Sequence, residues 1–555
     1  MFRKTKTCHQ LNLYTNSYNQ FSGRALKIYN DDKEWHNQFR EEILELIDED
    51  IFRPLFADDF GSPNSSIRVL VSMIILKDAH GLSDSQLHNN CLFHAQFRSA
   101  LGLHNNDDPI PVPATYYNFR KRIVDWERSG NDNLLERVFK QVTKSQFIYY
   151  KVSGKKARMD IKLIGSNIAK LSRYELVHEA LRMVYKSSKL KISKLLSKDD
   201  LVFLKDLFSQ SCFNITYHSS DSEIDTKLQQ LGIVIYKILK HFPGKLTEQL
   251  QTLQEIFWQQ FEVIEDAVSV LPKEKLLPGR VDSPHDPDCR FRKKGKQSLS
   301  GYYINVTETC DPDNDLNLIT SVIVEPANVP DQDFFQPACE ATEEVTNQKI
   351  ETNSSDGAYY CQDNFNYCVD NEIDHIMSGI SSSVSGFDIS VNDDGTLLVV
   401  DTLTDEVIPS KIVKTKSVDA EPKWSICVGG KKKYFTQKSV DACQAAKLAA
   451  TRSKEELNLR NNVEATIFQL GYHYRGNKTR YRGIIKHKLW AFARCIWINF
   501  RRIMKYMGSI RPDCVQNMIK CADSAQFFVF NSIIAFLLLF EIQNLQTQRK
   551  MFEMG

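Results

Sequence analysis

The sequence lacks the features that mark secreted, zinc-dependent and membrane-spanning proteins. Its 13 cysteines form no Cys-x2-Cys pair, and Cys361-x6-Cys368 has no matching second pair, so a zinc site is not expected. Because Met1 to Thr5 lacks the apolar core of a signal peptide, we expect a cytoplasmic protein with reduced thiols. The apolar run from Phe527 to Phe540 is about 14 residues long, whereas a membrane span needs roughly 20, so it is expected to pack on the core.

Two catalytic sequence motifs are also missing. Gly429-Gly430-Lys431 continues into Lys432 rather than into a Ser or Thr, so it is not the Gly-rich loop that binds nucleotide phosphates. No His-Glu-x-x-His stretch occurs, which argues against zinc-dependent hydrolysis. Neither ATP use nor a zinc-dependent reaction is therefore expected.

Excess charge of one sign is absent overall but present locally. The net charge is only +2, from 71 Lys and Arg against 69 Asp and Glu. From Gly471 to Pro512, however, no acidic residue occurs among many Arg and Lys residues, and Tyr474, Tyr481 and Trp490 are interspersed. Such a segment suits the phosphate backbone of a nucleic acid, although a solvated helix face has the same composition.

The N-terminal part of the chain is expected to be helical. Apolar spacing predicts helices at about 39–51 and 67–76, and Ser83 with Gln86 matches a capping box that starts another helix ending near residue 102. This order of helices is compatible with a helix-turn-helix that contacts DNA, and equally with any small helical bundle. A third helix, from about residue 115, carries the basic cluster Arg120, Lys121 and Arg122.

Helical and strand-like segments follow one another in the rest of the chain. A long helical stretch of about 170–275 precedes strands predicted at 302–306 and 318–324. A β-hairpin is predicted at 387–400, because a Gly-containing turn separates two apolar runs there. Further helices are predicted at about 331–350, 440–447, 455–468 and 485–507.

Three acidic residues stand in distinctive local settings. Asp160 follows a short basic run, Asp356 precedes Gly-Ala-Tyr-Tyr, and Glu464 lies four residues after Arg460. Carboxylates are the ligands that hard divalent ions such as Mg²⁺ select, and two such ions can stabilise the attacking and leaving oxygens of a phosphodiester displacement. We expect the fold to bring the three acids together, two of them at the ends of adjacent strands and one on a helix.

These settings resemble bacterial insertion-sequence transposases of the DDE type. Asp160 with its surrounding Arg-Met-Asp and Leu-Ile-Gly-Ser-Asn matches the first acid, Asp356-Gly-Ala-Tyr-Tyr the second, and Arg460-x3-Glu464 the third. Residues 61–126 resemble the N-terminal helical domain of such enzymes, and the segments 284–288, 301–303 and 331–332 resemble the core between the first two acids. Related patterns often place a Tyr and a Lys where this sequence has Leu457 and Gly471.

The resemblance implies an α/β fold with a ribonuclease-H-like mixed-sheet catalytic core and an all-helical N-terminal domain. The helical domain, for DNA binding and dimerisation, is expected over residues 1–150. The catalytic domain is expected over 151–510, with a helical insertion at about 170–280 and a β-rich insertion at about 375–440. An apolar C-terminal tail is expected over 511–555.

The implied activity is metal-dependent strand cleavage and transfer, with Mg²⁺ or Mn²⁺ as cofactor. The implied partner is double-stranded DNA, both transposon ends and target, bound by a homodimer in a bacterial cytoplasm at the nucleoid, with no membrane. A nuclease of the same fold that does not join strands, and a DNA-binding protein whose active site has decayed, remain as alternatives.

The site residues follow from these matches. Asp160, Asp356 and Glu464 are expected to be catalytic and to bind the metal, whereas Glu455 and Glu456 are weaker candidates for the third acid because they lack the Arg-x3-Glu setting. The acidic group of 282, 286 and 288, with the histidine at 285, is expected to be a hydrogen-bonded loop. The residues expected to contact DNA are Arg120, Lys121, Arg122, Arg460, Arg475, Lys478, Arg480 and Arg482.

Overall fold

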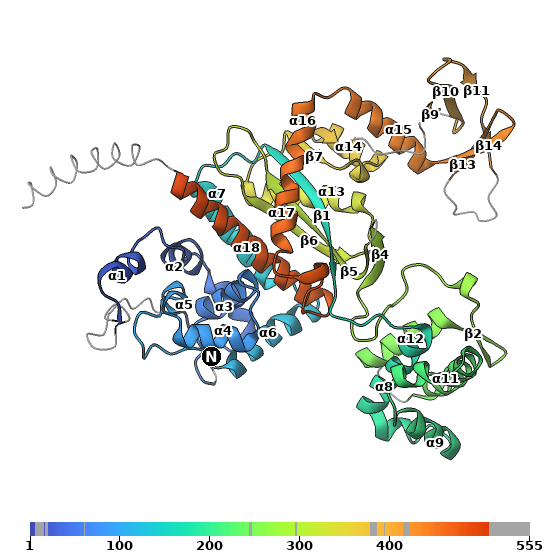
Figure 1. The fold of residues 1–555 in the computed structure, drawn as a ribbon, viewed down its shortest axis with the longest axis horizontal. Coiled ribbons are helices and arrows are strands. Elements are labelled where there is room, and N and C mark those ends of the chain that lie inside the picture. Colours follow the sequence, from blue (N-terminus) through green and yellow to red (C-terminus); the bar gives the residue numbers. More distant parts are fainter. Residues whose placement is uncertain are drawn as a thin grey trace, which may run out of the picture.

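A mixed sheet with helices on both faces occupies the centre of the molecule (Figure 1). The computed structural model describes residues 1–5, 16, 20–59, 61–242, 247–294, 297–377, 386–392, 394–413 and 422–509. The apolar run at 527–540 and the tail at 511–555 lie outside the described residues. Within the described ranges, no helix has the length and apolar character needed to cross a membrane.

The central sheet has the order β6-β5-β1-β7-β8. Strand β5 is antiparallel to both β1 and β6, whereas β7 runs parallel to β1, and β8 parallel to β7. A short strand, β4, pairs with the first residues of β5. The bounds are β1 Lys156–Gly165, β4 Arg290–Lys294, β5 Gln297–Thr309, β6 Ile319–Pro326, β7 Thr352–Ser355 and β8 Asp374–Met377.

Alternate residues of β1 face opposite sides of the sheet, as the pleat requires. Ala157, Met159, Ile161 and Leu163 are buried in the core that contains α13 (Phe335–Thr346). The opposite face packs against α17 (Val463–Leu470) and against α18 (Ile484–Ser509), which lies along β6. Figure 1 shows α17 beside β1 and α18 between the sheet and the N-terminal helices. The even-numbered residues of β1, Asp160 among them, therefore share the face that carries α17.

The N-terminal helices form one core with α18 and one face of the sheet. The capping box of Ser83 and Gln86 is confirmed, but the helix that was expected to reach residue 102 is interrupted at His94, whose backbone is extended. The amphipathic segment at 39–51 forms short π- and 3-10 turns rather than one α-helix. The helices are α1 Gly23–Tyr29, α2 Trp35–Phe39, α3 Ile67–Ala79, α4 Asp84–Phe93, α5 Ala95–Ala100, α6 Pro113–Arg128 and α7 Leu134–Tyr149.

Two further segments extend from the sheet (Figure 1). Between β1 and β4 lie α8 Arg173–Ile192, α9 Lys198–Leu207, α10 Cys212–Tyr217, α11 Asp221–His241 and α12 Glu248–Gln260, with their own apolar core. The helical stretch predicted to reach residue 275 ends at Gln260, because residues 261–270 form the hairpin β2 (Phe261–Ile264) and β3 (Ala267–Val270).

The second segment lies between β8 and α17. The hairpin predicted at 387–400 is confirmed by the pairing of β9 (Phe387–Val391) with β10 (Leu397–Asp401). Its other strands are β11 Val407–Ile408, β12 Lys411–Ile412, β13 Lys423–Val428 and β14 Lys431–Thr436. The helices nearby are α14 Gln362–Asp370, α15 Gln437–Ala450 and α16 Lys454–Asn458.

Candidate active site

Asp160 lies in the middle of β1 rather than at its end, which corrects the expectation from the sequence. The strand continues to Gly165 because residues 161–165 stay paired with β5. The Asp160 side chain is 15% exposed, and its Oδ1 accepts a hydrogen bond of 2.7 Å from the backbone N–H of Ile161. This bond helps to hold the carboxylate in one orientation on the face that carries α17.

Asp356 directly follows β7, at the level of Asp160. In the parallel pairing of β1 with β7, Arg158 lies opposite Ser354. Asp160 and Asp356 each lie two residues beyond this pair, on neighbouring strands that run in the same direction. The Asp356 side chain is 44% exposed, so the two carboxylates differ in their access to solvent.

The guanidinium group of Arg460 connects these two acids. Its Nη2 lies 3.7 Å from Oδ2 of Asp160 and 3.4 Å from Oδ2 of Asp356. Because one nitrogen contacts both, the two carboxylate oxygens lie within about 7 Å of each other. The positive charge of Arg460 offsets the repulsion between these two carboxylates.

Glu464 lies one helical turn after Arg460. The 3-10 turn Leu459–Asn462 leads directly into α17 and lies beside both β1 and β7. Val463, Thr466 and Leu470 form the buried stripe of α17, whereas Glu464 is exposed next to that stripe. Four residues of helix correspond to a rise of about 6 Å, so the Glu464 side chain starts within side-chain reach of the Arg460 group.

A buried ion cluster fixes α17 to the sheet, and the sequence analysis did not identify it. Glu308 on β5 is fully buried and contacts Arg158 at 2.6 Å, Arg502 at 2.5 Å and the Thr466 hydroxyl at 2.6 Å. Arg158 also donates a hydrogen bond of 2.9 Å to the carbonyl of Leu459, next to Arg460. Burial would raise the pKa of Glu308, but Arg502 and Arg158 hold that pKa below its ordinary value. The signal in the sequence was that Glu308 is the single charged residue in the segment 297–309.

Tyr359 is buried close to the two aspartates. Its hydroxyl donates a hydrogen bond of 2.7 Å to Oδ1 of Asn305 on β5. Burial, and then the negative charges of Asp160, Asp331 and Asp356, raise the pKa of Tyr359 well above its ordinary value. The phenol therefore stays neutral and acts as a fixed hydrogen-bond donor that holds the loop after β7 against β5.

The two weaker candidates for the third acid have other surroundings. Glu456 accepts a hydrogen bond of 2.8 Å from the backbone N–H of Ser453, completing the capping box of α16. It also lies 3.6 Å from Arg452, which pairs it with a different arginine from Arg460. Glu455 occupies the exposed first turn of the same helix. Of the three glutamates, only Glu464 continues the helical turn that carries Arg460.

Asp286 connects three segments of the chain through its side chain. It accepts hydrogen bonds from the hydroxyls of Ser166 and Tyr302 and, at 2.8 Å, from the backbone N–H of Gly483. The segment at 282–288 was expected to be a loop with local hydrogen bonds. The segment is such a loop, since the backbone N–H of Asp286 donates to the carbonyl of Ser283 at 3.2 Å. The Asp286 side chain also reaches residues far along the chain, and it fastens the basic segment after α17 to the end of β1.

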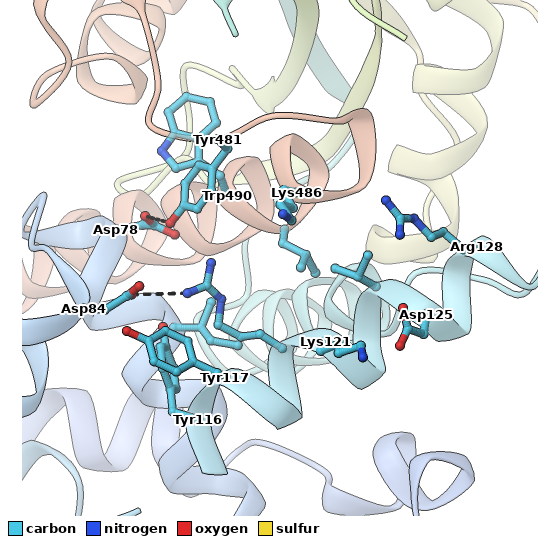
Figure 2. Close-up of a pocket in the computed structure, with 14 residues that line it drawn as sticks. Asp78, Asp84, Tyr116, Tyr117, Lys121, Asp125, Arg128, Tyr481, Lys486 and Trp490 are labelled. Carbon is cyan, nitrogen blue, oxygen red and sulfur yellow. Dashed lines mark hydrogen bonds and ion pairs between the residues drawn. The ribbon is translucent and has the colours of Figure 1, made fainter. Parts of the chain in front are cut away.

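The N-terminal basic cluster is divided between two surfaces. Arg120 is held by Asp84 at 3.2 Å and lies over the rings of Tyr116 and Tyr481. Arg120 and Lys121 both line a cleft with a volume of about 350 Å³. Lys121 is labelled in the view of this cleft in Figure 2. Arg122 instead donates a hydrogen bond to the carbonyl of Leu55 at 3.4 Å, in a different cavity.

The basic segment after α17 reaches that cleft from the other side. Figure 2 shows Tyr481 and Lys486 opposite Lys121 and Arg128, so basic residues distant in sequence line one cleft between α6 and the start of α18. Partial burial, and then the charges of Arg120, Arg128 and Arg482, lower the pKa of Lys486. Four basic side chains thus line the cleft, together with the acidic side chains of Asp78, Asp84 and Asp125.

The four basic residues selected from the segment lie at its surface, but two are tied to the chain after β1. Lys478 donates to the carbonyl of Ile168 at 2.5 Å, and Arg482 donates to the carbonyl of Asn167 at 2.6 Å. Arg475 and Arg480 are exposed in the connecting turns. The basic segment is thus held beside the end of β1 rather than extending freely from α17.

Comparison with known proteins gives one match. Residues 28–122 match the family model described as a transposase domain (DUF772). No curated protein and no solved structure matches the chain. The matched range covers the end of α1 through most of α6, and these helices pack on α18 and on one face of the sheet. The match identifies residues 28–122 as similar to a transposase domain.

Proposed function

We propose that the protein is a DDE transposase that binds the ends of a DNA element and cleaves and transfers strands at a metal site formed by Asp160, Asp356 and Glu464. The observation that carries this proposal is the contact of one guanidinium, that of Arg460, with both aspartates, one helical turn before Glu464. The transposase domain at 28–122 supports the same function independently.

The architecture supports the ribonuclease-H-like core that the resemblance implies. The first acid lies on the central strand β1, and the second follows the adjacent parallel strand β7. The third lies on a helix packed on the same face of β1. This arrangement supports the assignment of three acids that are separated by about 300 residues of sequence to one site.

The donor set fits a hard divalent cation. Two aspartate oxygens lie within about 7 Å of each other, and a third carboxylate is exposed nearby without an ion pair among the described residues. Oxygen ligands of this kind suit Mg²⁺ or Mn²⁺ rather than zinc. When bound, such ions supply Lewis-acid stabilisation of the attacking and leaving oxygens.

The residues of the chain have separable tasks in this proposal. Asp160, fixed by the backbone of Ile161, and Asp356 would hold the cation, while Arg460 offsets their negative charge and can grip a phosphate oxygen. The buried cluster around Glu308 keeps α17 in place against β1. Because transesterification retains the energy of the phosphodiester bond, no nucleotide cofactor is needed.

The experiment that tests the proposal compares cleavage and binding of labelled end DNA. Asp160→Asn, Asp356→Asn and Glu464→Gln each keep the side-chain shape and remove the charge that holds the cation. We expect each change to abolish cleavage and to leave binding in a gel-shift assay largely intact. The matched control, Glu455→Gln, should cleave as the wild type does. Normal cleavage by any of the three variants would remove that residue from the site.

The two alternatives predict different outcomes in the same assay. A nuclease of this fold would cleave the end without joining it to a target, so products longer than the substrate would be missing. A DNA-binding protein with a decayed site would bind without any cleavage in Mg²⁺ or Mn²⁺. Paired terminal repeats flanking the gene would favour the transposase over both.

A further inference from the structure

Gly471, at the C-terminal end of α17, is not a glycine for conformational reasons. Its backbone has φ −93° and ψ 4°, a region that any L-amino acid adopts. Glycine is needed where φ is positive or where another group approaches closely. Since φ is negative, the backbone conformation does not require glycine here, and the surrounding space is the remaining structural constraint.

That space is occupied by the side chain of Lys162. A Cβ placed on Gly471 would lie 2.7 Å from Cε and 3.3 Å from Nζ of Lys162. The first distance is too short for two carbon atoms, so a larger residue at 471 would displace the lysine. The ammonium group of Lys162 therefore lies where a side chain at 471 would begin.

Lys162 also lies beside the proposed catalytic acids. It follows Asp160 by two residues on β1, so both side chains emerge on the face that packs against α17, about 6.6 Å apart along the strand. Lys162 is half-buried, and its long stem can cover the end of α17 while the charge stays in reach of solvent. The ammonium group therefore lies at the C-terminal end of α17, where the basic segment begins, and it reaches this point from the strand that carries Asp160.

We propose that Lys162 binds a backbone phosphate of the DNA beside the site of cleavage, and that Gly471 leaves the room in which this lysine lies. The proposal rests on the proposed function, because it requires DNA at the three acids. It assigns to Lys162 a substrate contact, and it explains the glycine at the end of α17 by the close approach of that side chain.

The test removes the lysine at 162 on β1 and places a lysine at 471, at the end of α17, so that the positive charge enters the same space from the helix. Lys162→Ala should cleave end DNA more slowly, and the salt slope of its binding should fall by about 0.9, the value for one phosphate neutralised by a lysine. Lys162→Arg should retain the slope. In the double variant Lys162→Ala with Gly471→Lys, the lysine returns from the helix side, and both cleavage and slope should recover. Gly471→Lys alone should be impaired, because two lysines then compete for one space.

The controls separate this inference from the proposed function. Lys205→Ala, an exposed lysine in the helical insertion, should leave cleavage and slope unchanged. If the wild-type protein cleaves and Lys162→Ala matches it in rate and slope, the inference is wrong and the proposed function stands. If Lys162→Ala is impaired and the double variant does not recover, the claim that the two positions share one space for a phosphate-binding charge is overturned. A wild-type protein that binds but never cleaves contradicts the proposed function itself.

Discussion

Removing the charge of Glu308 should destabilise the sheet and loosen the helix that carries Glu464. Glu308 is fully buried, and its two partners, Arg158 and Arg502, are 9% and 20% exposed at their side chains. In Glu308→Gln both guanidinium groups would lose their counter-charge while remaining largely out of water. Breaking a buried ion cluster by removing one member costs about 3–5 kcal/mol. We expect the lower part of this range, because Arg502 is exposed enough to turn towards solvent.

The assay is urea unfolding followed by tryptophan fluorescence. Trp490 and Trp497 are buried on α18, the helix that also carries Arg502, so their emission reports on this part of the molecule. The matched control is Glu340→Gln, an exposed glutamate on α13. A loss of less than about 1 kcal/mol in Glu308→Gln, comparable to an exposed pair, would refute the reasoning.

The same residue predicts a pH dependence of stability. Since the pKa of Glu308 is lower in the folded protein than its ordinary value, its contribution is fully present above the unfolded pKa of about 4.3. The contribution is lost as the pH falls through the lowered folded pKa. Wild-type stability should therefore drop in acid, and Glu308→Gln should lack this part of the drop.

Two further predictions concern DNA. Arg480→Ala with Arg482→Ala should lower the salt slope of duplex binding by about 0.9 for each phosphate that these arginines neutralise, measured by fluorescence anisotropy over a range of salt; an unchanged affinity and slope would mean that this surface is only solvated. Lys121→Ala with Lys486→Ala should weaken binding at the cleft in Figure 2 while leaving Arg120 paired with Asp84. A loss confined to the end sequence would indicate end recognition, because phosphate contacts carry no sequence information.

The elements that sequence reasoning predicted well are those with a local signal. The capping box at Ser83, the hairpin at 387–400 and the long helix α18 depend on neighbouring residues, and each is present. The helix break at His94 and the hairpin after Gln260 were missed. Neither place has a Gly or Pro to mark the end of a helix. After Gln260 the alternation of Phe261 to Val270 around the turn at Glu265 and Asp266 was a local signal for a hairpin that was overlooked.

In the candidate site, too, features with a local sequence signal were predicted and contacts between distant segments were not. The three acids were selected from their local settings, but the contact of Arg460 with both aspartates depends on pairing between β1 and β7. The cluster of Arg158, Glu308 and Arg502 joins three distant parts of the chain, and no sequence spacing indicates it. The placement of Asp160 in mid-strand could not be predicted either, because the length of β1 is set by its partner β5.

The most direct test of the central claim is the stoichiometry of Mn²⁺ binding in the presence of end DNA. The three carboxylates are proposed to hold the ions together, so removing one charge should affect the whole site. We expect the wild-type protein to bind up to two ions, and Asp160→Asn, Asp356→Asn and Glu464→Gln each to lose at least one of them, while Glu455→Gln binds as the wild type. Wild-type stoichiometry and affinity in all three variants would contradict the account.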